Sequence, residues 1–449
     1  MGQISPGQVT FVLLSFEGPD RYSMAGCLGM RATELSSALA RAGYDTHLIF
    51  VGDPQAPGTE RALGGRLVRH RWCQWISAYY PGGVYAGEEA KRYDFTESVP
   101  AFVVERIARP AIESRRLVVV MAEEWQTAET ACRISDRLHT TGLRANVVLL
   151  WNANNTTGFD RIDWGRLDYV ARITTVSRYM KHRMWSRGVN PLVIPNGIPS
   201  RLLRPASPPG AAVLRGSLGK PVVLTKIGRW DPDKRWLMAV EALAELKRGS
   251  DDAVLLALGG REPHKAEVLQ RARELGLVVR TVSVGEPGLA AYAQAFAAGM
   301  PADIFDVRSL VPLPLLRAIY RASDAVLANS GHEPFGLVGL EAMAAGAVAI
   351  TGGTGEDYAM HLQNAIVLDT ADPLELAWYV RFLKAHPAVT RRLARAARAT
   401  ARRFTWERVL QTLFEKIEFL AARQGALPKV ASPPAEERPA TPPPMLAAV

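Results

Sequence analysis

The chain has 449 residues, 48% hydrophobic and 22% charged, which is the composition of a folded globular protein with room for two domains of about 100 to 200 residues. Its 54 Lys and Arg residues exceed its 44 Asp and Glu residues, and the formal charge of +10 favours anionic ligands. Three widely spaced cysteines, Cys27, Cys73 and Cys132, argue against a disulfide framework and a cysteine-based metal site.

The excess positive charge is concentrated in an Arg-rich helical segment at 391–403, which we interpret as a solvated helix face. No motif of a nucleic-acid-binding domain accompanies it, so we expect no nucleic acid partner, whereas peripheral contact with an anionic membrane surface remains an alternative. The sequence has no secretory signal pattern and no run of about 18 apolar residues. We therefore expect a cytoplasmic protein.

The first half of the chain alternates short apolar runs with helical patterns. A glycine-containing loop and a helical pattern at 31–42 separate the first two runs. The predicted strands are 9–15, 46–51, 117–121, 146–150 and 173–176. Apolar runs without polar alternation are typical of buried parallel strands, so the pattern predicts an α/β fold with a doubly wound parallel sheet.

The second half repeats this alternation after the turn-rich segment 195–199, where we place the domain boundary. Its predicted strands are 222–227, 253–258, 278–282, 325–328 and 348–350, and its predicted helices are 235–246, 265–275, 315–321 and 337–345. Two Rossmann-like domains of this kind face one another across an interdomain cleft, and such sheets bind ligands beyond the carboxyl ends of their strands.

The predicted organisation has four parts. They are an acceptor-side domain at 1–198, a nucleotide-sugar-binding domain at 199–400, a C-terminal helix at 401–425 that crosses back to the first domain, and a Pro- and Ala-rich disordered tail at 426–449.

A segment with a phosphate-binding pattern precedes the predicted helix 337–345, and it reads His332-Glu333-Pro334-Phe335-Gly336-Leu337-Val338-Gly339-Leu340-Glu341. We place Pro334 in the first helical turn, where its missing N–H has no cost. Free amides at the helix N-terminus can then bind a diphosphate, namely those of Phe335, Gly336, Leu337 and Val338. Glu333 can reach sugar hydroxyls, and Glu341, about two turns further on, can accept hydrogen bonds from a ribose diol. A helix entry with an acidic residue and no ligand is an equal alternative.

A second polar segment, Lys226-Ile227-Gly228-Arg229-Trp230-Asp231-Pro232-Asp233-Lys234-Arg235, ends the predicted strand 222–227. Arg229 and Lys234 can neutralise the β-phosphate of a departing nucleotide, because fixed cations stabilise the charge that develops in the transition state. We interpret Asp231 and Asp233 as turn and helix-start residues and not as metal ligands. A polar turn with surface salt bridges is the alternative.

Both segments, together with Thr174-Thr175-Val176-Ser177 and Ile194-Pro195-Asn196-Gly197-Ile198, resemble the retaining GT-B glycosyltransferases of the glycogen-synthase and sucrose-synthase type, the glycosyl transferases group 1. The resemblance spans roughly residues 9–420 and is sharper in the second domain. It implies that the second domain binds the nucleotide sugar and that the first largely binds the acceptor, whether saccharide, lipid or small molecule. It also implies retention of the anomeric configuration and a C-terminal helix near Trp406 that returns to the first domain.

The resemblance assigns roles to individual residues of this sequence. The implied catalytic residues are Arg229, Lys234 and Glu333, and the implied donor-binding residues are Gly26, Phe335, Gly336, Leu337, Val338 and Glu341. No metal ligand and no cofactor are expected, since the nucleotide diphosphate sugar is a co-substrate. We expect hexosyl transfer from a UDP-sugar to an acceptor that the sequence does not identify.

The first domain departs from the family pattern. The loop 26–29 lacks the two adjacent glycines of the relatives, and Met24 stands where starch- and glycogen-forming enzymes carry a lysine, which argues against an ADP-glucose polymerase. Glu123 stands where the family has a histidine that contacts the donor sugar, so contact with the sugar is a hypothesis for Glu123. The loops 150–155 and 352–356 are further candidates, the first for binding hydroxyls and the second for closing over the donor.

A group of aromatic residues completes the candidates, and it is either a sugar-stacking acceptor surface or part of the core: Trp72, Trp75, Tyr79, Tyr80 and Tyr85. Two alternatives to a transferase remain open. One is a sugar-nucleotide epimerase of the same fold, and the other is a catalytically silent module that binds nucleotide sugars, for which Glu123 is the best argument.

Overall fold

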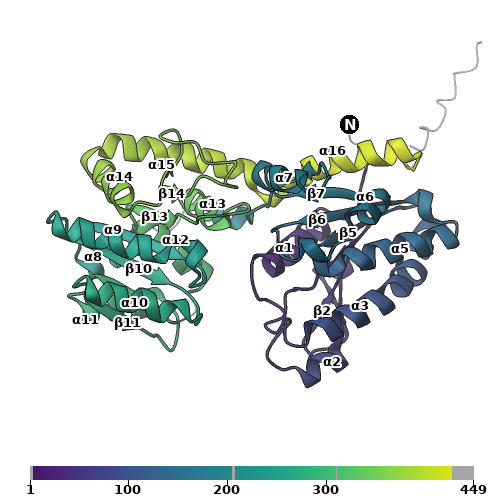
Figure 1. Ribbon diagram of the computed structural model, residues 1–449, viewed down its shortest axis with the longest axis horizontal. Coiled ribbons are helices and arrows are strands. Elements are labelled where there is room, and N and C mark those ends of the chain that lie inside the picture. Colours follow the sequence, from purple (N-terminus) through teal and green to yellow (C-terminus); the bar gives the residue numbers. More distant parts are fainter. Residues whose placement is uncertain (1–3, 205–207, 310, 427–449) are drawn as a thin grey trace, which may run out of the picture.

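The computed structural model describes residues 4–204, 208–309 and 311–426. It has two lobes side by side, each built around a mainly parallel sheet, with the N-terminal lobe on the right of Figure 1 and the C-terminal lobe on the left. The predicted fold class, two doubly wound α/β domains, is confirmed. Of the predicted disordered tail, residues 427–449 lie outside the described part of the chain.

The sheet of the N-terminal lobe has eight strands in the order β3-β4-β2-β1-β5-β6-β7-β8. Neighbouring strands are parallel except β3 and β4, which pair antiparallel at one edge. The strands are β1 (Val9–Leu14), β2 (Asp45–Val51), β3 (Thr59–Ala62), β4 (Leu67–Trp72), β5 (Leu117–Glu123), β6 (Val147–Ala153), β7 (Arg172–Thr175) and β8 (Leu192–Val193). The helices of this lobe are α1 (Cys27–Arg41), α2 (Gln74–Tyr79), α3 (Glu88–Phe102), α4 (Arg109–Glu113), α5 (Ala128–Thr140), α6 (Trp164–Val170) and α7 (Arg178–Trp185).

The sheet of the C-terminal lobe has seven parallel strands in the order β11-β12-β10-β9-β13-β14-β15. The strands are β9 (Val222–Ile227), β10 (Ala253–Leu258), β11 (Val279–Val282), β12 (Ile304–Val307), β13 (Ala325–Ala328), β14 (Ala349–Thr351) and β15 (Ile366–Val367). The helices are α8 (Pro208–Leu218), α9 (Trp236–Arg248), α10 (His264–Glu274), α11 (Leu289–Gly299), α12 (Leu313–Ala322), α13 (Leu337–Ala345), α14 (Pro373–Ala385) and α15 (Pro387–Ala401).

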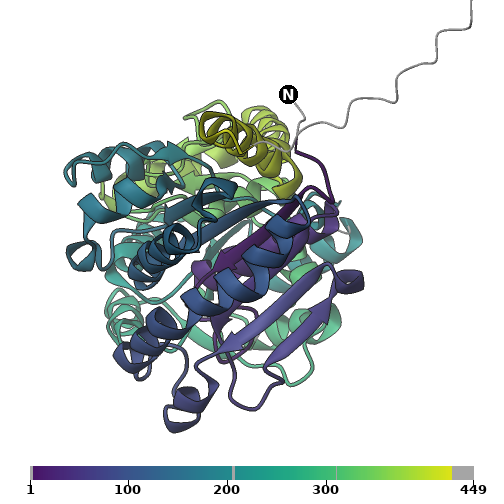
Figure 2. The same ribbon diagram turned by 90° about the vertical axis from the view of Figure 1, so that its right-hand side faces the viewer.

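Both sheets are covered on both faces, as their apolar strands require. In β1 every residue is buried, and alternate side chains point to opposite faces of the sheet. Val12 and Leu14 therefore join one core, whereas Phe11 and Leu13 join the other. Figure 2, which views the molecule from its N-terminal side, shows helices in front of and behind this sheet.

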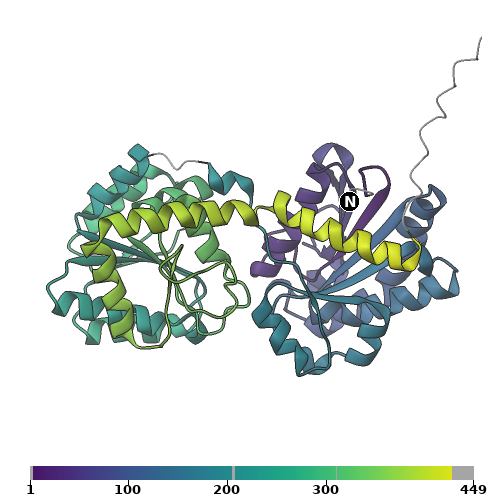
Figure 3. The same ribbon diagram turned by 90° about the horizontal axis from the view of Figure 1, so that it is seen from above.

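The last helix, α16 (Trp406–Gln424), leaves the C-terminal lobe and packs on the N-terminal sheet, as the yellow ribbon in Figure 3 shows. Its buried apolar side chains, among them Trp406, Leu410 and Ile417, share a core with Phe11 and Tyr44. The chain crosses between the lobes twice at one place, because Ile198 pairs with Thr405 in a parallel bridge. Gly197 lies against the Trp406 ring, and a Cβ atom there would come within 2.5 Å of it.

Direct contacts also join the lobes near the end of β7. The amide of Arg178 donates to Asp357 Oδ2 at 2.7 Å, and the Tyr179 hydroxyl lies 3.2 Å from His332 Nδ1. Both contacts connect the start of α7 with loops at the carboxyl ends of the strands of the second sheet. They bring the segments in which chemistry was predicted toward the first lobe.

Candidate active site between the two sheets

Lys234 lies in a short turn that the local sequence determines. After β9, the side chain of Asp231 accepts a hydrogen bond from the amide of Asp233 at 2.9 Å, and this cap starts the single helical turn Pro232–Lys234. Arg235 then takes a left-handed conformation with φ of 50°, and α9 begins at Trp236. The two acidic residues of this turn are thus turn and cap residues, as predicted.

Glu333 lies on the loop after β13, the strand that neighbours β9 in the sheet. Its Oε2 accepts hydrogen bonds from Lys234 Nζ at 2.6 Å and from Ser330 Oγ at 3.0 Å. Asp233 connects the two loops, since its carbonyl accepts from the Gly331 amide at 2.7 Å and its Oδ1 from the His332 amide at 3.1 Å. The structure therefore brings Lys234 and Glu333 together.

Burial alone would lower the pKa of Lys234, but the Glu333 carboxylate more than offsets this effect and the net shift of the pKa is upward. Lys234 is therefore a fixed cation at neutral pH. Its side chain is 24% exposed and that of Glu333 is 17% exposed, so a ligand can reach both groups.

Arg229 does not join this pair. Its side chain is 65% exposed, and its guanidinium lies 3.9 Å from Asp231. Within the described residues no ion pair connects Arg229 with Glu333. The sequence placed two cations at the leaving phosphate, whereas in this structure Lys234 alone of the two lies beside Glu333.

The N-terminus of α13 is close to the predicted one but begins later. Gly336, with φ of 81°, is the residue before the helix, and Leu337 is its first residue, so the prediction that Pro334 lies in the first helical turn is wrong. Phe335 is buried against Tyr358 and Phe404 and anchors the loop. The amides of Gly336, Leu337 and Val338 lie at the helix start, where a diphosphate can bind.

Close packing explains why a glycine occupies position 336. A Cβ atom there would come within 2.6 Å of Glu356 Cγ and 2.9 Å of the Tyr358 hydroxyl, in addition to the unfavourable backbone conformation. The Tyr358 hydroxyl also donates to the carbonyl of Gly336. The backbone at the start of α13 is therefore held in place by side chains from the loop after β14.

Glu341 lies one helix face further along α13, at a distance of 3.4 Å from the Tyr320 hydroxyl, which donates to its Oε2. Burial raises the pKa of Glu341 to about 7, the hydrogen bond from Tyr320 opposes the rise, and Glu34 of α1 adds to it. Because Glu34 belongs to the first lobe, Glu341 also faces that lobe. A carboxyl in this place can accept hydrogen bonds from a ribose diol once it is ionised.

Two titratable groups at this site received no role from the sequence. Glu356 is buried, its Oε2 accepts from the Thr354 amide at 2.9 Å, and burial and then the Glu333 charge raise its pKa to about 8. Lys226 is buried beneath Lys234 with its Nζ 2.5 Å from Asn329 Oδ1, and burial lowers its pKa to about 7. A lysine in the apolar strand β9 and a glutamate after two glycines were the available sequence signals.

The glycine loop of the first lobe faces this site. The Cys27 side chain is exposed, yet burial by surrounding protein raises its pKa to about 11, and the charges of Glu333, Lys234 and Glu341 act on it from the second lobe. Solvent can thus reach a thiol that residues of both lobes enclose. The loop after β1 and the loops after β9 and β13 are therefore turned toward one another, in agreement with the places of α1 and α13 in Figure 1.

The amides of that glycine loop already have an anionic partner. Oε2 of Glu17 accepts hydrogen bonds from the amides of Ala25 at 3.2 Å, Gly26 at 2.8 Å and Gly29 at 2.9 Å. The amide of Gly26, which the resemblance assigned to donor binding, is satisfied by Glu17. A phosphate could bind these amides only by displacing the Glu17 carboxylate.

Glu123 does not point to a sugar site. It is fully buried, and its carboxylate accepts from Arg31 Nε at 3.0 Å and from the side-chain amides of Asn152 and Asn154, each at 2.9 Å. Arg31 in turn donates to Asn196 at 2.5 Å, beside the crossing between the lobes. The hypothesis that Glu123 contacts the sugar is not supported by this geometry, because its oxygens bind protein groups that fix the ends of β5 and β6.

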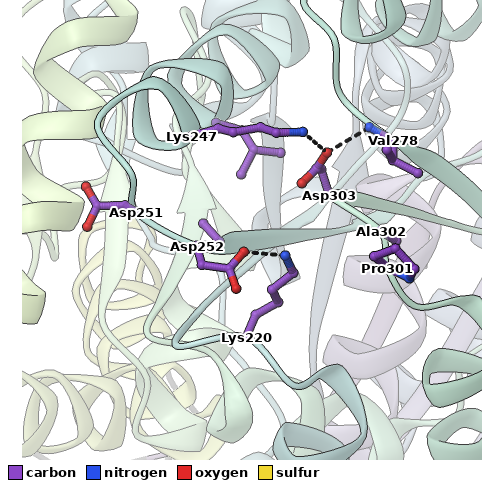
Figure 4. Close-up of a pocket in the computed structure, with 10 residues that line it drawn as sticks. Lys220, Lys247, Asp251, Asp252, Val278, Pro301, Ala302 and Asp303 are labelled. Carbon is purple, nitrogen blue, oxygen red and sulfur yellow. Dashed lines mark hydrogen bonds and ion pairs between the residues drawn. The ribbon is translucent and has the colours of Figure 1, made fainter.

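Another cavity lies at the opposite edge of the second sheet, before the first residues of β10 and β12 (Figure 4). Lys247 pairs with Asp303 at 2.7 Å, and Lys220 pairs with Asp252. These pairs use the charges that line it. In the described part of the chain, no cluster of three or more His, Cys, Asp or Glu side chains could hold a metal ion, and no helix is long and apolar enough to cross a membrane.

Comparison with known proteins agrees with this geometry. Residues 307–400, which include Glu333, α13 and Glu356, match the family model described as glycosyl transferases group 1. The chain contains a group 1 glycosyl transferase domain. The predicted family resemblance is confirmed.

Curated relatives of this group 1 chain have two kinds of name. A glycogen synthase of Mycobacterium tuberculosis is 31% identical over 209 residues, which cover 46% of this chain and 44% of the relative. A D-inositol 3-phosphate glycosyltransferase of Kineococcus radiotolerans is 26% identical over 447 residues, covering 90% of this chain and 94% of the relative. The match thus spans less than half the length of the glycogen synthase.

Solved structures show the GT-B fold for the group 1 chain. Sucrose-phosphate synthase from Thermosynechococcus elongatus superimposes with a TM-score of 0.62 at 18% identity, over 92% of this chain and 99% of that one. Anabaena HepE, solved in complex with UDP and glucose, gives a TM-score of 0.62 at 16% identity, over 91% and 99% of the two chains.

Proposed function

We propose that this protein is a glycosyltransferase that moves a hexosyl group from a nucleotide diphosphate sugar, which we take to be a UDP-sugar, to an acceptor hydroxyl. The observation that carries the proposal is the pair of Lys234 Nζ and Glu333 Oε2, 2.6 Å apart at the start of α13 and facing the glycine loop of the other lobe. A fixed cation and a carboxylate side by side are the groups that a phosphate and a sugar hydroxyl need.

Each group has a task in this reaction. Lys234 exchanges Glu333 for the β-phosphate, and with the amides of Gly336, Leu337 and Val338 it stabilises the negative charge that grows as the bond to the anomeric carbon breaks. Glu333 accepts hydrogen bonds from the hydroxyls of the transferred sugar. Glu341 accepts hydrogen bonds from the ribose. Retention of the anomeric configuration and independence of divalent metal are part of the proposal.

The structural neighbours support a nucleotide diphosphate sugar as donor. HepE was solved with UDP and with UDP-glucose, and the catalytic domain of starch synthase IV from Arabidopsis thaliana was solved with ADP and acarbose. We choose uridine over adenine because Met24 stands where the resemblance places a lysine in enzymes that use ADP-glucose. The three cysteines are free thiols in the structure, and we propose a cytoplasmic location.

A thermal-shift panel of UDP, GDP, ADP and TDP sugars tests the donor. At about 100 times its dissociation constant, a ligand should stabilise the protein by roughly 2.7 kcal/mol. Release of nucleotide is then measured with and without candidate acceptors, and the anomeric configuration of the product is determined by NMR. Nucleotide release that rises with an acceptor supports the transferase, and activity that persists in EDTA supports metal independence.

Two other outcomes would replace the proposal. An epimerised sugar nucleotide formed without any acceptor would identify an epimerase of the same fold. Binding of the donor without any release of nucleotide would identify a silent binding module.

A further inference from the structure

A set of polar and aromatic side chains at the edge of the first sheet has no role in donor binding. Tyr85 is 41% exposed, and its hydroxyl donates to Glu17 Oε1 at 2.5 Å. The pKa of Tyr85 is raised by burial of its hydroxyl, then by Glu17, and also by the charges of Glu124 and Glu88. Since all three carboxyl groups act on one phenol, they surround a common region.

This region lies across from the donor site. Glu17 binds the amide of Gly26, and the next residue, Cys27, is within the electrostatic reach of both Glu17 and Glu333. Glu124 follows the end of β5 and accepts a hydrogen bond from the Asn154 amide at 2.6 Å. A molecule bound here lies beside the sugar that Glu333 is proposed to hold, which is where an acceptor must lie.

One buried polar atom in this region still lacks a partner. Gln126 is only 5% exposed, and its Nε2 donates to Glu88 Oε1 at 3.0 Å. Its Oε1 has no hydrogen-bond partner among the residues that the structure describes. Buried side-chain oxygens are rarely left unpaired, so this atom is available for a donor on a ligand, such as a hydroxyl.

The cations near this region are already bound to other groups. Lys91 is buried, and its Nζ donates to the Tyr22 hydroxyl at 2.7 Å and to the carbonyls of Gly83, Val84 and Ala86. Arg31 binds Glu123, as described above.

Two further guanidinium groups lie over the Trp125 ring, beside a hollow of about 490 Å³. Arg92 and Arg161 both pair with Glu89. The charge that remains toward an acceptor is therefore negative, and burial followed by the charge of Glu123 raises the pKa of Glu124 to about 8, with the Asn154 amide opposing the rise. A phosphate here would lack a counter-charge and would be repelled by the carboxylates.

Exposed aromatic side chains extend the region. Trp75 is 65% exposed and Tyr79 78%, both on α2, and Tyr80 follows at 43%. Rings that face solvent in this number next to hydrogen-bonding carboxylates suit the apolar faces and the hydroxyls of a saccharide. Trp72, which the sequence grouped with them, is half-buried and bonds Ser98, so it belongs to the core side.

We propose that the acceptor is a saccharide without phosphate groups, bound through its hydroxyls by Glu88, Glu124 and Gln126 and through a ring face by Tyr85. This inference rests on the proposed transferase function and specifies its acceptor. In the balanced reaction, the acceptor oxygen forms the new bond to the anomeric carbon, the bond from that carbon to the phosphate oxygen breaks, and the hydroxyl proton leaves with the nucleotide diphosphate.

Matched acceptor pairs test the proposal, with the donor that the thermal-shift panel selects. Glucose is compared with glucose 6-phosphate, myo-inositol with myo-inositol 3-phosphate, and maltotriose is added as a longer saccharide. We expect the unphosphorylated member to have a kcat/KM at least about tenfold higher, as one uncompensated charge contact predicts. A higher kcat/KM for the phosphorylated members, or no transfer to any unphosphorylated saccharide, would overturn the acceptor assignment.

Variants separate this site from the donor site. Tyr85→Ala should raise the acceptor KM by about tenfold and leave the donor KM unchanged, while Tyr85→Phe, which keeps the ring, should change it by less than about threefold. Tyr169→Ala removes a tyrosine that is 88% exposed on α6 and is the matched control. Arg21 is exposed on the loop after β1, and loss of activity in Arg21→Gln would reveal an anionic acceptor.

The two proposals fail in distinguishable ways. Slow hydrolysis of the donor in the absence of acceptor, with a normal donor KM, shows that the donor half works whatever the acceptor is. If hydrolysis persists and the acceptor panel fails, the acceptor inference is wrong. If no nucleotide is ever released, the transferase function itself is wrong.

Discussion

Substitution of Lys234 by methionine removes the cation at the proposed phosphate site and keeps most of the side-chain volume. A phosphate oxygen about 4 Å from Nζ, in surroundings with an effective dielectric constant of about 20, interacts with that charge by about 4 kcal/mol. Loss of one donor to a developing negative charge costs a factor of about 10² to 10³ in kcat in comparable sites. We therefore expect kcat to fall by about 10² to 10³.

The assay is steady-state release of nucleotide at saturating acceptor. Arg229→Met is the matched control, because Arg229 is a cation on the same turn whose side chain is 65% exposed. We expect less than about a threefold change in this variant, since an exposed and solvated charge contributes little. The thermal midpoint of Lys234→Met should also be measured, because Glu333 keeps the hydroxyl of Ser330 as a partner after Lys234 is lost.

Two results would refute the reasoning. The first is a kcat for Lys234→Met within about threefold of the wild type. The second is an equal loss in both variants, which would mean that the turn as a whole matters and that the pair with Glu333 does not.

Three further predictions concern the second lobe and the last helix. Glu341→Gln should weaken nucleotide binding, and because the pKa of Glu341 is raised to about 7, wild-type affinity measured by calorimetry should increase as the pH rises through about 7, while the variant should show a flat profile. Glu356 has a pKa raised to about 8, so the native state holds its proton where the unfolded state has lost it; its contribution to stability should therefore be full below about pH 4.5 and fall as the pH rises toward about 8, and thermal unfolding of Glu356→Gln should lack this part of the pH dependence. Trp406→Ala should destabilise the protein to urea by about 3 to 5 kcal/mol because the ring is buried beneath the crossing between the lobes, whereas Phe419→Ala on the same helix, at 58% exposure, should stay within about 0.5 kcal/mol; equal losses would show that α16 is not docked as described.

The sequence predicted strands best where both faces are buried. The ranges 222–227, 253–258 and 325–328 are those of β9, β10 and β13 in the structure, because continuous apolar runs of that length leave few alternatives. Strands with charged residues were missed. In β4 the guanidinium of Arg71 is held by Asp20 and Glu60, and in β12 the buried Asp306 pairs with Lys265, and pairings of this kind over long sequence separations are invisible in a single sequence.

The same distinction applies to the site. Lys234 and Glu333 follow neighbouring parallel strands, so the spacing of their motifs was sufficient to predict that they meet. Arg229 follows Gly228, whose φ of 153° is open to glycine, and the direction of a side chain after such a residue does not follow from the sequence. Glu123 is bound by Arg31, 92 residues earlier in the chain, so its burial depends on a contact that only the folded structure reveals.

Comparison of a nucleoside diphosphate with its monophosphate tests the central claim most directly. With the base that the panel selects, dissociation constants of both ligands are measured by calorimetry for the wild type and for Lys234→Met. If Lys234 and the start of α13 hold the β-phosphate, the wild type binds the diphosphate at least about tenfold more tightly, and Lys234→Met loses this preference while its affinity for the monophosphate stays within about threefold. Equal weakening of both ligands, or an unchanged preference in the variant, would contradict the account.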